Sequence, residues 1–236
     1  WDPETFLNTA GLLRAAHTET AGAASEGITA ACVVPPAVAW KPTAEGIENT
    51  NYFVTTRDPR GSEREWVLTR VEQADTPAEE VAVWLDHLHG GGLPVPAPAV
   101  LRRPGPGARF TTVHEGHPVV LFQRLPGGHP ERFEPWMCAA AGAFLARLHR
   151  AGTPPGILQR HHVRDLAWLE RKAERLRSDL RPDRRALLDG ALTRQRDLED
   201  RADWAALPRG VVHGDLFHDN ALFRDGRLTG VIDFYH

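Results

Sequence analysis

Residues 211–223, VVHGDLFHDNALF, place two acids, two histidines and an asparagine within eight positions, directly after two valines and before an apolar pair. Such a pattern is typical of a polar turn between two short apolar segments. The residues that follow, ALFRDGRLTGVIDF, indicate a hairpin with its turn at Asp225 and Gly226. This part of the chain is therefore predicted to be a polar loop followed by a hairpin.

The spacing of the polar residues suits phosphoryl transfer to a hydroxyl. That reaction needs a carboxylate to orient and deprotonate the hydroxyl, and oxygen ligands for the Mg²⁺ that neutralises the triphosphate. Kinase catalytic loops supply these groups as H-x-D-x-x-x-x-N, and His213, Asp215 and Asn220 stand at that spacing. A second metal carboxylate is expected across a hairpin, at the start of a D-F-G-like segment, where Asp233 lies in VIDFYH.

Two other interpretations of these residues stay open. The loop acids and Asn220 could merely cap turns, and Asp233 could simply end a strand. A second alternative is a hydrolytic zinc or manganese site with four ligands from the loop: His213, Asp215, His218 and Asp219. That assignment leaves Asn220 and Asp233 without a role. In the kinase interpretation, His213 holds the loop through hydrogen bonds and His218 is a solvated loop residue.

The chain before this loop divides into a strand-rich and a helix-rich half. Period-two patterning predicts four strands, at 51–56, 65–72, 109–115 and 118–125. One helix interrupts them, with Thr76 as its N-cap, Glu79 completing a capping box and a glycine stop at 90–92. Helical periodicity then predicts three helices, at 135–150, 163–179 and 184–203.

This order of elements predicts an α+β fold with the two-lobed layout of protein kinases. Residues 1–125 would form a nucleotide-binding lobe, an antiparallel β-rich sheet with one helix. Residues 126–236 would form a mainly helical catalytic lobe that carries the hairpin. With 236 residues, 42% of them hydrophobic, the chain is long enough for two small lobes of about 100 residues each.

Composition and charge narrow the class of partner. The chain has 28 basic and 31 acidic residues and no basic run, so nucleic acid is not the expected partner. No apolar run approaches the roughly 18 residues that a membrane span requires, and the start lacks a signal-peptide pattern. The two cysteines have no paired spacing, so a reducing cytoplasm is the expected location.

The segments HGDLFHDNALF and GVIDFY resemble the catalytic and metal-binding segments of the aminoglycoside-phosphotransferase and choline-kinase superfamily. Within it, four further segments resemble the bacterial homoserine kinases of this fold: GIENTNYFV (46–54), WVLT (66–69), GLPVPAP (92–98) and LFQRLPG (121–127). The resemblance implies transfer of the ATP γ-phosphate to the side-chain hydroxyl of L-homoserine, a step towards threonine. It also implies that further helices follow the hairpin, so that the catalytic lobe is incomplete at residue 236.

The resemblance assigns roles to single residues of the chain. Asp215 would be the catalytic base, and Asn220 and Asp233 would be the magnesium ligands. A turn that begins at Gly46 would cover the phosphates of ATP. Either Asn49 or an asparagine two residues later, Asn51, would approach these phosphates.

The connector after the last strand would contact the base of the nucleotide. Gln123 and Leu125 would offer backbone groups to the adenine edge, with Leu68 and Phe122 as apolar walls. A plain core role for these residues is the alternative.

The strand lysine that clamps the phosphates in protein kinases has no counterpart in WVLT. Thr69 stands in its place, as it tends to in the resembling homoserine kinases, and strand alternation points Arg70 to the opposite face. Lys41 or an arginine could supply the missing charge. The partner acid on the helix would be Glu79 or Glu80, although both also suit the first turn of a helix.

Three other functions share parts of this pattern. An aminoglycoside-type antibiotic phosphotransferase would keep every catalytic residue but would need an acid-rich acceptor pocket. A non-catalytic relative would bind Mg-ATP without releasing ADP, and the missing strand lysine favours it. A metal-dependent hydrolase would retain a transition metal and would need no ATP.

Overall fold

The computed structural model describes residues 32–43, 49–72, 77–102, 109–157 and 165–235. Gly46, expected in the phosphate turn, and Thr76, expected as a helix N-cap, lie outside these residues. The chain forms two compact units, one of residues 1–158 and 211–236, the other of residues 159–210. The lobe boundary expected at residue 125 stays a prediction.

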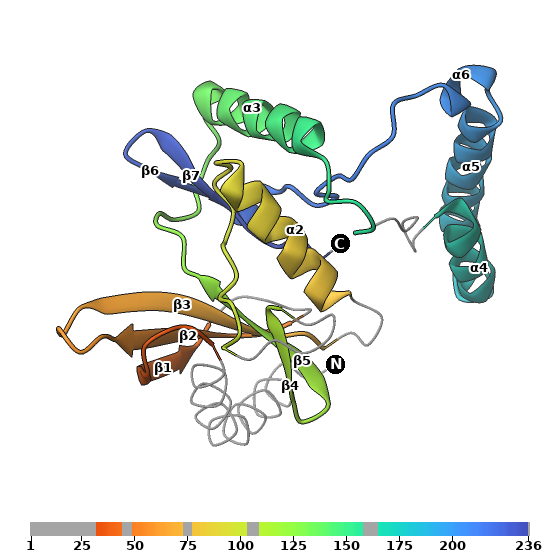
Figure 1. The fold of residues 1–236 in the computed structure, drawn as a ribbon. Helices are drawn as coiled ribbons and strands as arrows, with labels where there is room; N and C mark the ends of the chain where they lie inside the picture. Colours follow the sequence, from red (N-terminus) through yellow and green to blue (C-terminus); the bar gives the residue numbers. More distant parts are fainter. Residues whose placement is uncertain (1–31, 44–48, 73–76, 103–108, 158–164, 236) are drawn as a thin grey trace. The chain divides into compact units, whose positions relative to one another are not determined.

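The first unit contains a five-stranded antiparallel sheet with the strand order β1-β2-β3-β5-β4 (Figure 1). The strands are β1 (Ala37–Pro42), β2 (Thr50–Arg57), β3 (Glu63–Arg70), β4 (Thr111–His114) and β5 (His117–Gln123). Four of them were predicted, and β1 was not. In β1 only Ala37 and Trp40 are half-buried and the pairing with β2 contains a bulge, so period-two patterning is absent from this edge strand.

The register of β3 and β5 decides which side chains share a face of the sheet. Leu68 pairs with Leu121, and both lie in one apolar cluster. The next pair is Val67 with Phe122, and Phe122 belongs to the cluster on the other face. The prediction that Leu68 and Phe122 wall the same site is therefore wrong, because one step along the strand moves a side chain to the opposite face.

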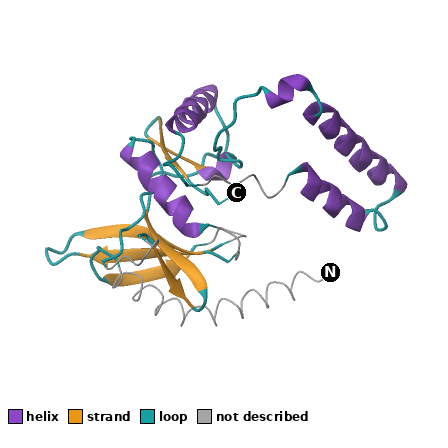
Figure 2. Ribbon diagram, turned by 45° about the vertical axis from the view of Figure 1, so that its right-hand side comes forward, coloured by secondary structure: helices purple, strands orange, loops and turns teal. Residues whose placement is uncertain are grey.

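The helix α2 (Ala78–Gly90) packs against β4 and β5 on the face that holds Phe122 (Figure 2). Its buried side chains include the predicted stripe of Val81, Trp84, Leu85 and Leu88. Glu79, whose expected capping-box partner Thr76 lies outside the described residues, bonds to a distant segment of the chain. Its carboxylate accepts hydrogen bonds from the backbone N–H groups of Arg109 (2.6 Å), Phe110 (3.1 Å) and Thr111 (2.8 Å). Glu79 thus joins the start of α2 to the start of β4.

Replacing Glu79 by alanine is expected to lower the free energy of unfolding by about 3 kcal/mol, because backbone donors beside the fully buried Phe110 lose their acceptor. Glu79→Gln keeps one acceptor oxygen and should cost less. Urea denaturation measures both changes. Glu131→Ala removes an exposed loop carboxylate and should change stability by less than about 0.5 kcal/mol. Equal losses in the Glu79 and Glu131 variants would contradict this assignment.

The first unit also contains α3 (Pro135–Ala151), which contacts the hairpin strand of residues 227–231. The second unit consists of α4 (Leu166–Leu176), α5 (Pro182–Glu199) and the short α6 (Ala202–Ala205). Asp165 caps α4 by accepting a hydrogen bond from the backbone N–H of Trp168 (2.8 Å), and an ion pair between Arg196 and Glu170 joins α5 to α4. Of the helices described, none has the length and apolar character needed to cross a membrane.

Candidate active site

The predicted hairpin is present and brings its two flanking segments together. It consists of β6 (Ala221–Arg224) and β7 (Arg227–Val231), with Ala221 paired to Val231. Asp225 and Gly226 have φ values of 50° and 71°, as a tight turn with left-handed central residues requires. The pairing places the residues just before β6 opposite those just after β7.

Ile232 fixes the backbone on both sides of the loop. Its N–H donates to the carbonyl of Asn220 (3.0 Å), and its own carbonyl accepts a hydrogen bond from Nε2 of His213 (2.9 Å). Since a carbonyl can only accept, Nε2 carries the proton, and Nδ1 accepts the N–H of Asp215 (3.3 Å). The prediction that the buried His213 holds the loop is confirmed. Asp233, the next residue, is thereby fixed beside the loop.

Asn220 is oriented by a hydrogen bond to the loop backbone. Its Nδ2 donates to the carbonyl of Asp215 (2.8 Å) and lies 3.4 Å from the Asp215 carboxylate. The amide oxygen, Oδ1, accepts no hydrogen bond from the part of the chain that the structure describes. Asn220 is buried, whereas the carboxylates of Asp215 and Asp233 belong to exposed residues. An unused amide oxygen and a carboxylate are the hard oxygen ligands that Mg²⁺ prefers, so these residues fit the predicted ion.

The alternative metal site within the loop is not formed. Both ring nitrogens of His213 are taken by the backbone, and His218 and Asp219 form a pair 3.7 Å apart with both side chains more than half exposed. Over the described ranges, no three His, Cys, Asp or Glu side chains are grouped so as to hold a metal ion. The loop therefore lacks the geometry of a hydrolytic zinc or manganese centre.

Phe234 connects the segment after β7 to α2. Its ring is buried, and the centroid of the ring lies 4.5 Å from that of His213 and 5.4 Å from that of Trp84. Trp84 in turn donates from Nε1 to the carbonyl of Gly152 (2.8 Å) at the end of α3. The sequence showed Trp84 only as part of an apolar stripe. Its position identifies it as a packing support for the segment that carries Asp233.

Tyr235 follows Phe234 and points its hydroxyl into the protein. That hydroxyl is buried without a hydrogen-bond partner among the described residues. Burial raises the pKa of Tyr235, and the negative charge of Asp233 raises it further, so the phenol stays neutral. A neutral phenol would not compete with the carboxylate of Asp233 for a cation.

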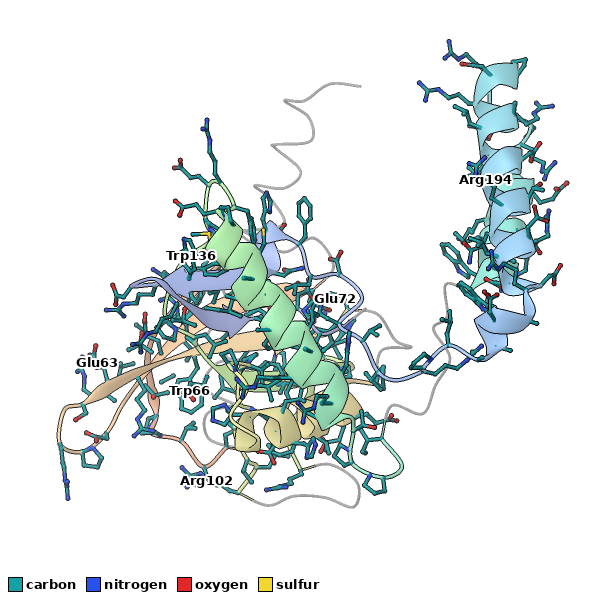
Figure 3. All side chains as sticks on the ribbon, turned by 90° about the horizontal axis from the view of Figure 1, so that it is seen from above. Glu63, Trp66, Glu72, Arg102, Trp136 and Arg194 are labelled. Carbon is teal, nitrogen blue, oxygen red and sulfur yellow. The ribbon has the colours of Figure 1, made fainter. Side chains whose placement is uncertain are left out.

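Three of the residues predicted to bind the nucleotide form one hydrogen-bonded group. Thr69, which is buried, pairs with Asn51 across the sheet and donates from Oγ1 to Oδ1 of Asn51 (2.7 Å). Nδ2 of Asn51 donates to the carbonyl of Asn49 (3.4 Å). Oδ1 of Asn49 accepts the backbone N–H of Glu72 (3.3 Å). In Figure 3, Glu72 lies towards the opposite end of β3 from Glu63.

Cations lie near this group on both faces of the sheet, with Lys41 and Arg124 over the ring of Phe53, and which of them replaces the missing lysine stays a prediction. Arg70 lies on the other face, as predicted, where its guanidinium is 3.5 Å from Glu72 and 3.6 Å from Glu115. Lys41 lies over the ring of Phe53, with Nζ 5.6 Å from the ring centroid. Phe53 lies two residues after Asn51 in β2, so its side chain is on the same face of the sheet as that of Thr69.

The backbone N–H groups of the connector after β5 differ in whether they are already hydrogen-bonded. The N–H of Gln123 donates to the carbonyl of Ala97 (2.8 Å), and that of Arg124 donates to the carbonyl of Glu65 (3.1 Å). The N–H of Leu125 donates to no residue in the described part of the chain. Of the two residues expected at the adenine edge, Leu125 is therefore the one with a free N–H.

Two glycines allow this connector to lie directly on the catalytic hairpin. A Cβ on Gly230 would lie 2.7 Å from Cδ1 of Leu125 and 3.0 Å from Cδ1 of Leu222. A Cβ on Gly127, whose φ is 112°, would lie 2.5 Å from Oγ1 of Thr229. Side chains at these two positions would push the connector away from β6 and β7.

Comparison with known proteins relates this arrangement to a family. Residues 39–236 match the phosphotransferase enzyme family. A homoserine kinase of Polaromonas naphthalenivorans is 36% identical over 200 residues, covering 83% of this chain and 59% of that protein. A homoserine kinase of Pseudomonas aeruginosa is 39% identical over 196 residues, covering 82% and 58%. The chain thus spans less than two thirds of the length of these relatives.

Solved structures agree with the fold. A spectinomycin phosphotransferase in complex with ADP and spectinomycin has a TM-score of 0.61 at 13% identity, over 90% of this chain and 68% of that one. A thermostable mutant of an aminoglycoside phosphotransferase, in a complex with AMP-PNP and hygromycin B, has a TM-score of 0.58 at 20% identity, over 85% and 67%. The predicted α+β, protein-kinase-like fold is confirmed.

Proposed function

The chain belongs to the phosphotransferase enzyme family, and we propose that it transfers the γ-phosphate of ATP to the side-chain hydroxyl of L-homoserine. One observation carries the choice of reaction. Ile232 and His213 hold together a loop carboxylate, an amide oxygen and a second carboxylate, on Asp215, Asn220 and Asp233. The homoserine kinases at 36% and 39% identity support the choice of acceptor.

Each residue of this group has a distinct task in the proposed reaction. The exposed carboxylate of Asp215 would orient the acceptor hydroxyl and accept its proton as the phosphoryl group is transferred. Asn220 and Asp233 would hold Mg²⁺ through oxygen atoms. When bound, that ion would neutralise charge on the triphosphate. The remaining contribution of the protein is to position the reactants.

The base of ATP would lie against the connector. The free N–H of Leu125 would donate to the adenine edge, and the side chains of Leu125 and Leu222, which converge on Gly230, would form an apolar surface below it. Gln123 would contribute no N–H, because that donor is already used. We retain residue 125 as the boundary between the nucleotide-binding lobe and the catalytic lobe.

The same proposal includes a cellular setting. We place the enzyme in threonine biosynthesis in a bacterial cytoplasm, where ATP is available and cysteines remain reduced. Its two cysteines, the buried Cys32 and the exposed Cys138, are free thiols. Its partners would be small hydroxylated molecules rather than nucleic acid, in keeping with a net charge of -3.

ADP release from the purified protein tests the proposal. Homoserine, choline, methylthioribose, spectinomycin and hygromycin B would each be supplied with ATP, once with Mg²⁺ and once with a chelator. We expect homoserine with Mg²⁺ to give a kcat/KM at least about tenfold above that of any other acceptor, a discrimination of about 1.4 kcal/mol. A higher value with an antibiotic would assign the enzyme to antibiotic modification. ATP binding without ADP release from any acceptor would indicate a non-catalytic relative.

A further inference from the structure

The C-terminal ends of α2 and α3 enclose a hollow that the candidate active site does not include. The two helices lie side by side (Figure 1), and Arg147 of α3 donates from Nη2 to the carbonyl of Gly92, just beyond α2 (2.8 Å). The hollow between the helix ends, called here the α2–α3 hollow, has a volume of about 790 Å³. That volume lies within the usual range of small-molecule sites.

One wall of the α2–α3 hollow carries two cations. Arg147 and Arg150 are three residues apart in α3, so their side chains lie on the same side of the helix. The bond to Gly92 occupies only one of the N–H donors of Arg147. Arg150 is exposed and has neither a hydrogen bond nor an ion pair within the described part of the chain. Guanidinium groups with donors to spare are the usual ligands of a carboxylate.

The facing wall carries an acid. Asp86 lies one turn before Gly90 in α2, and both residues line the hollow. Oδ2 of Asp86 is 3.5 Å from a guanidinium nitrogen of Arg109, which does not line the hollow. No ion pair joins Asp86 to either arginine of the opposite wall in the described ranges. Opposite charges thus line one hollow without neutralising each other.

The helix dipoles explain only half of this arrangement. Arginines near the end of α3 face the negative end of its dipole, which stabilises them. The same effect disfavours a carboxylate in the last part of α2, where Asp86 lies. A cationic group of a ligand would offset that cost, as Arg109 does from outside the hollow.

The remaining lining limits what else the ligand can carry. The buried Leu93 and the half-buried Ala151 provide a short apolar surface. A Cβ added at Gly90 would have no atom within 4 Å, so the hollow is open on that side. A small aliphatic group therefore fits between the charged walls.

We propose that the α2–α3 hollow binds an α-amino acid with a small aliphatic side chain. Arg147 and Arg150 hold its carboxylate, Asp86 holds its ammonium group, and the side chain lies against Leu93 and Ala151. This site is separate from the phosphoryl-transfer site and does not depend on the proposed function. A ligand that joins the two walls would brace the packing of α2 against α3.

Calorimetric titration with L-valine and two analogues tests the chemistry of the ligand. We expect valine to bind with a Kd of about 1 mM or below. Isobutylamine lacks the carboxylate of valine, and 3-methylbutanoate lacks its amine. Each analogue leaves one charged wall without a partner, so each should bind at least about tenfold more weakly.

Variants of the two walls test the location. Arg150→Gln and Asp86→Asn should each raise the Kd of valine at least about tenfold. Arg132→Gln removes an exposed arginine from the loop before α3 and should leave that Kd within about twofold. Arg109→Gln removes the ion-pair partner of Asp86 outside the hollow and should leave it within about threefold.

The outcomes also separate this site from the acceptor site. Equal affinity for valine and 3-methylbutanoate would overturn the role of Asp86, and no binding of valine would overturn the proposal. Valine binding unchanged in Arg150→Gln and Asp86→Asn would place the ligand elsewhere and overturn the location. Arg150→Gln should keep kcat/KM for homoserine within about twofold, and a parallel loss would mean that the two sites are one. Valine binding at these residues by a protein that phosphorylates no homoserine would support this site and reject only the proposed function.

Discussion

Asp215→Asn is expected to lower kcat for homoserine phosphorylation about 10³-fold, while the Kd for ATP stays within about twofold of the wild-type value. Asparagine has the shape of aspartate but cannot take the proton of the acceptor hydroxyl. The Asp215 backbone, which bonds to His213 and Asn220, is unchanged by the substitution, so the loop keeps its conformation. Steady-state ADP release and equilibrium ATP binding measure the two quantities.

The neighbouring acid of the same loop provides the control. Asp219 has a side chain that is 62% exposed and has His218 as its ion-pair partner, 3.7 Å away. Asp219→Asn should therefore keep kcat within about twofold of the wild-type value. If Asp215→Asn retained near wild-type turnover, or Asp219→Asn lost as much, Asp215 would not be the base.

Local spacing explains why the polar loop and the hairpin after it could be predicted from the sequence. His213, Asp215 and Asn220 lie within eight residues, and a two-residue turn connects β6 to β7, so few conformations of this segment satisfy its hydrogen bonds. The structural role of His213 follows from the same short range. The two backbone hydrogen bonds of Ile232, to Asn220 and His213, follow from the pairing of Ala221 with Val231 in the hairpin.

Contacts between distant segments could not be predicted in this way. Glu79 has the spacing of a capping box, yet it binds the N–H of Phe110, 31 residues further along the chain. That partner exists only once α2 has packed against β4. For the same reason, Leu68 and Phe122 were predicted to wall one site although they lie on opposite faces of the sheet. Its strand was predicted correctly, but the register of β3 against β5 sets which residues of β5 share its face.

The sequence alone did not distinguish Asn49 from Asn51 as the residue that would approach the phosphates of ATP. Asn49 and Asn51 are equivalent in the sequence, since both follow the predicted phosphate turn. Their hydrogen bonds distinguish them: both polar atoms of the Asn51 side chain are hydrogen-bonded, whereas among the described residues only the oxygen of the Asn49 side chain is. Thr69 donates to Asn51, and its expected contact with the nucleotide stays a prediction.

The contribution of Asp233 to metal binding can be separated from its contribution to the backbone. Asp233 has a φ of 67°, a left-handed conformation that asparagine adopts more readily than alanine does. Asparagine at this position therefore keeps the backbone, and with it the packing of Phe234 against His213 and Trp84. The lost quantity is one negative charge at the site that would bind Mg²⁺.

Asp233→Asn is expected to raise the Kd for ATP in the presence of Mg²⁺ at least about a hundredfold, because even second-sphere changes cost up to about that much in metal affinity. The Kd measured with a chelator, where no divalent ion takes part, should change by less than about twofold. Asp225→Asn makes the same substitution at another left-handed position, in the exposed hairpin turn, and should change neither value. Calorimetric titration with and without Mg²⁺ gives the Kd of the wild type and of each variant under both conditions. Equal losses under both conditions would mean that Asp233 shapes the nucleotide site rather than binding its metal.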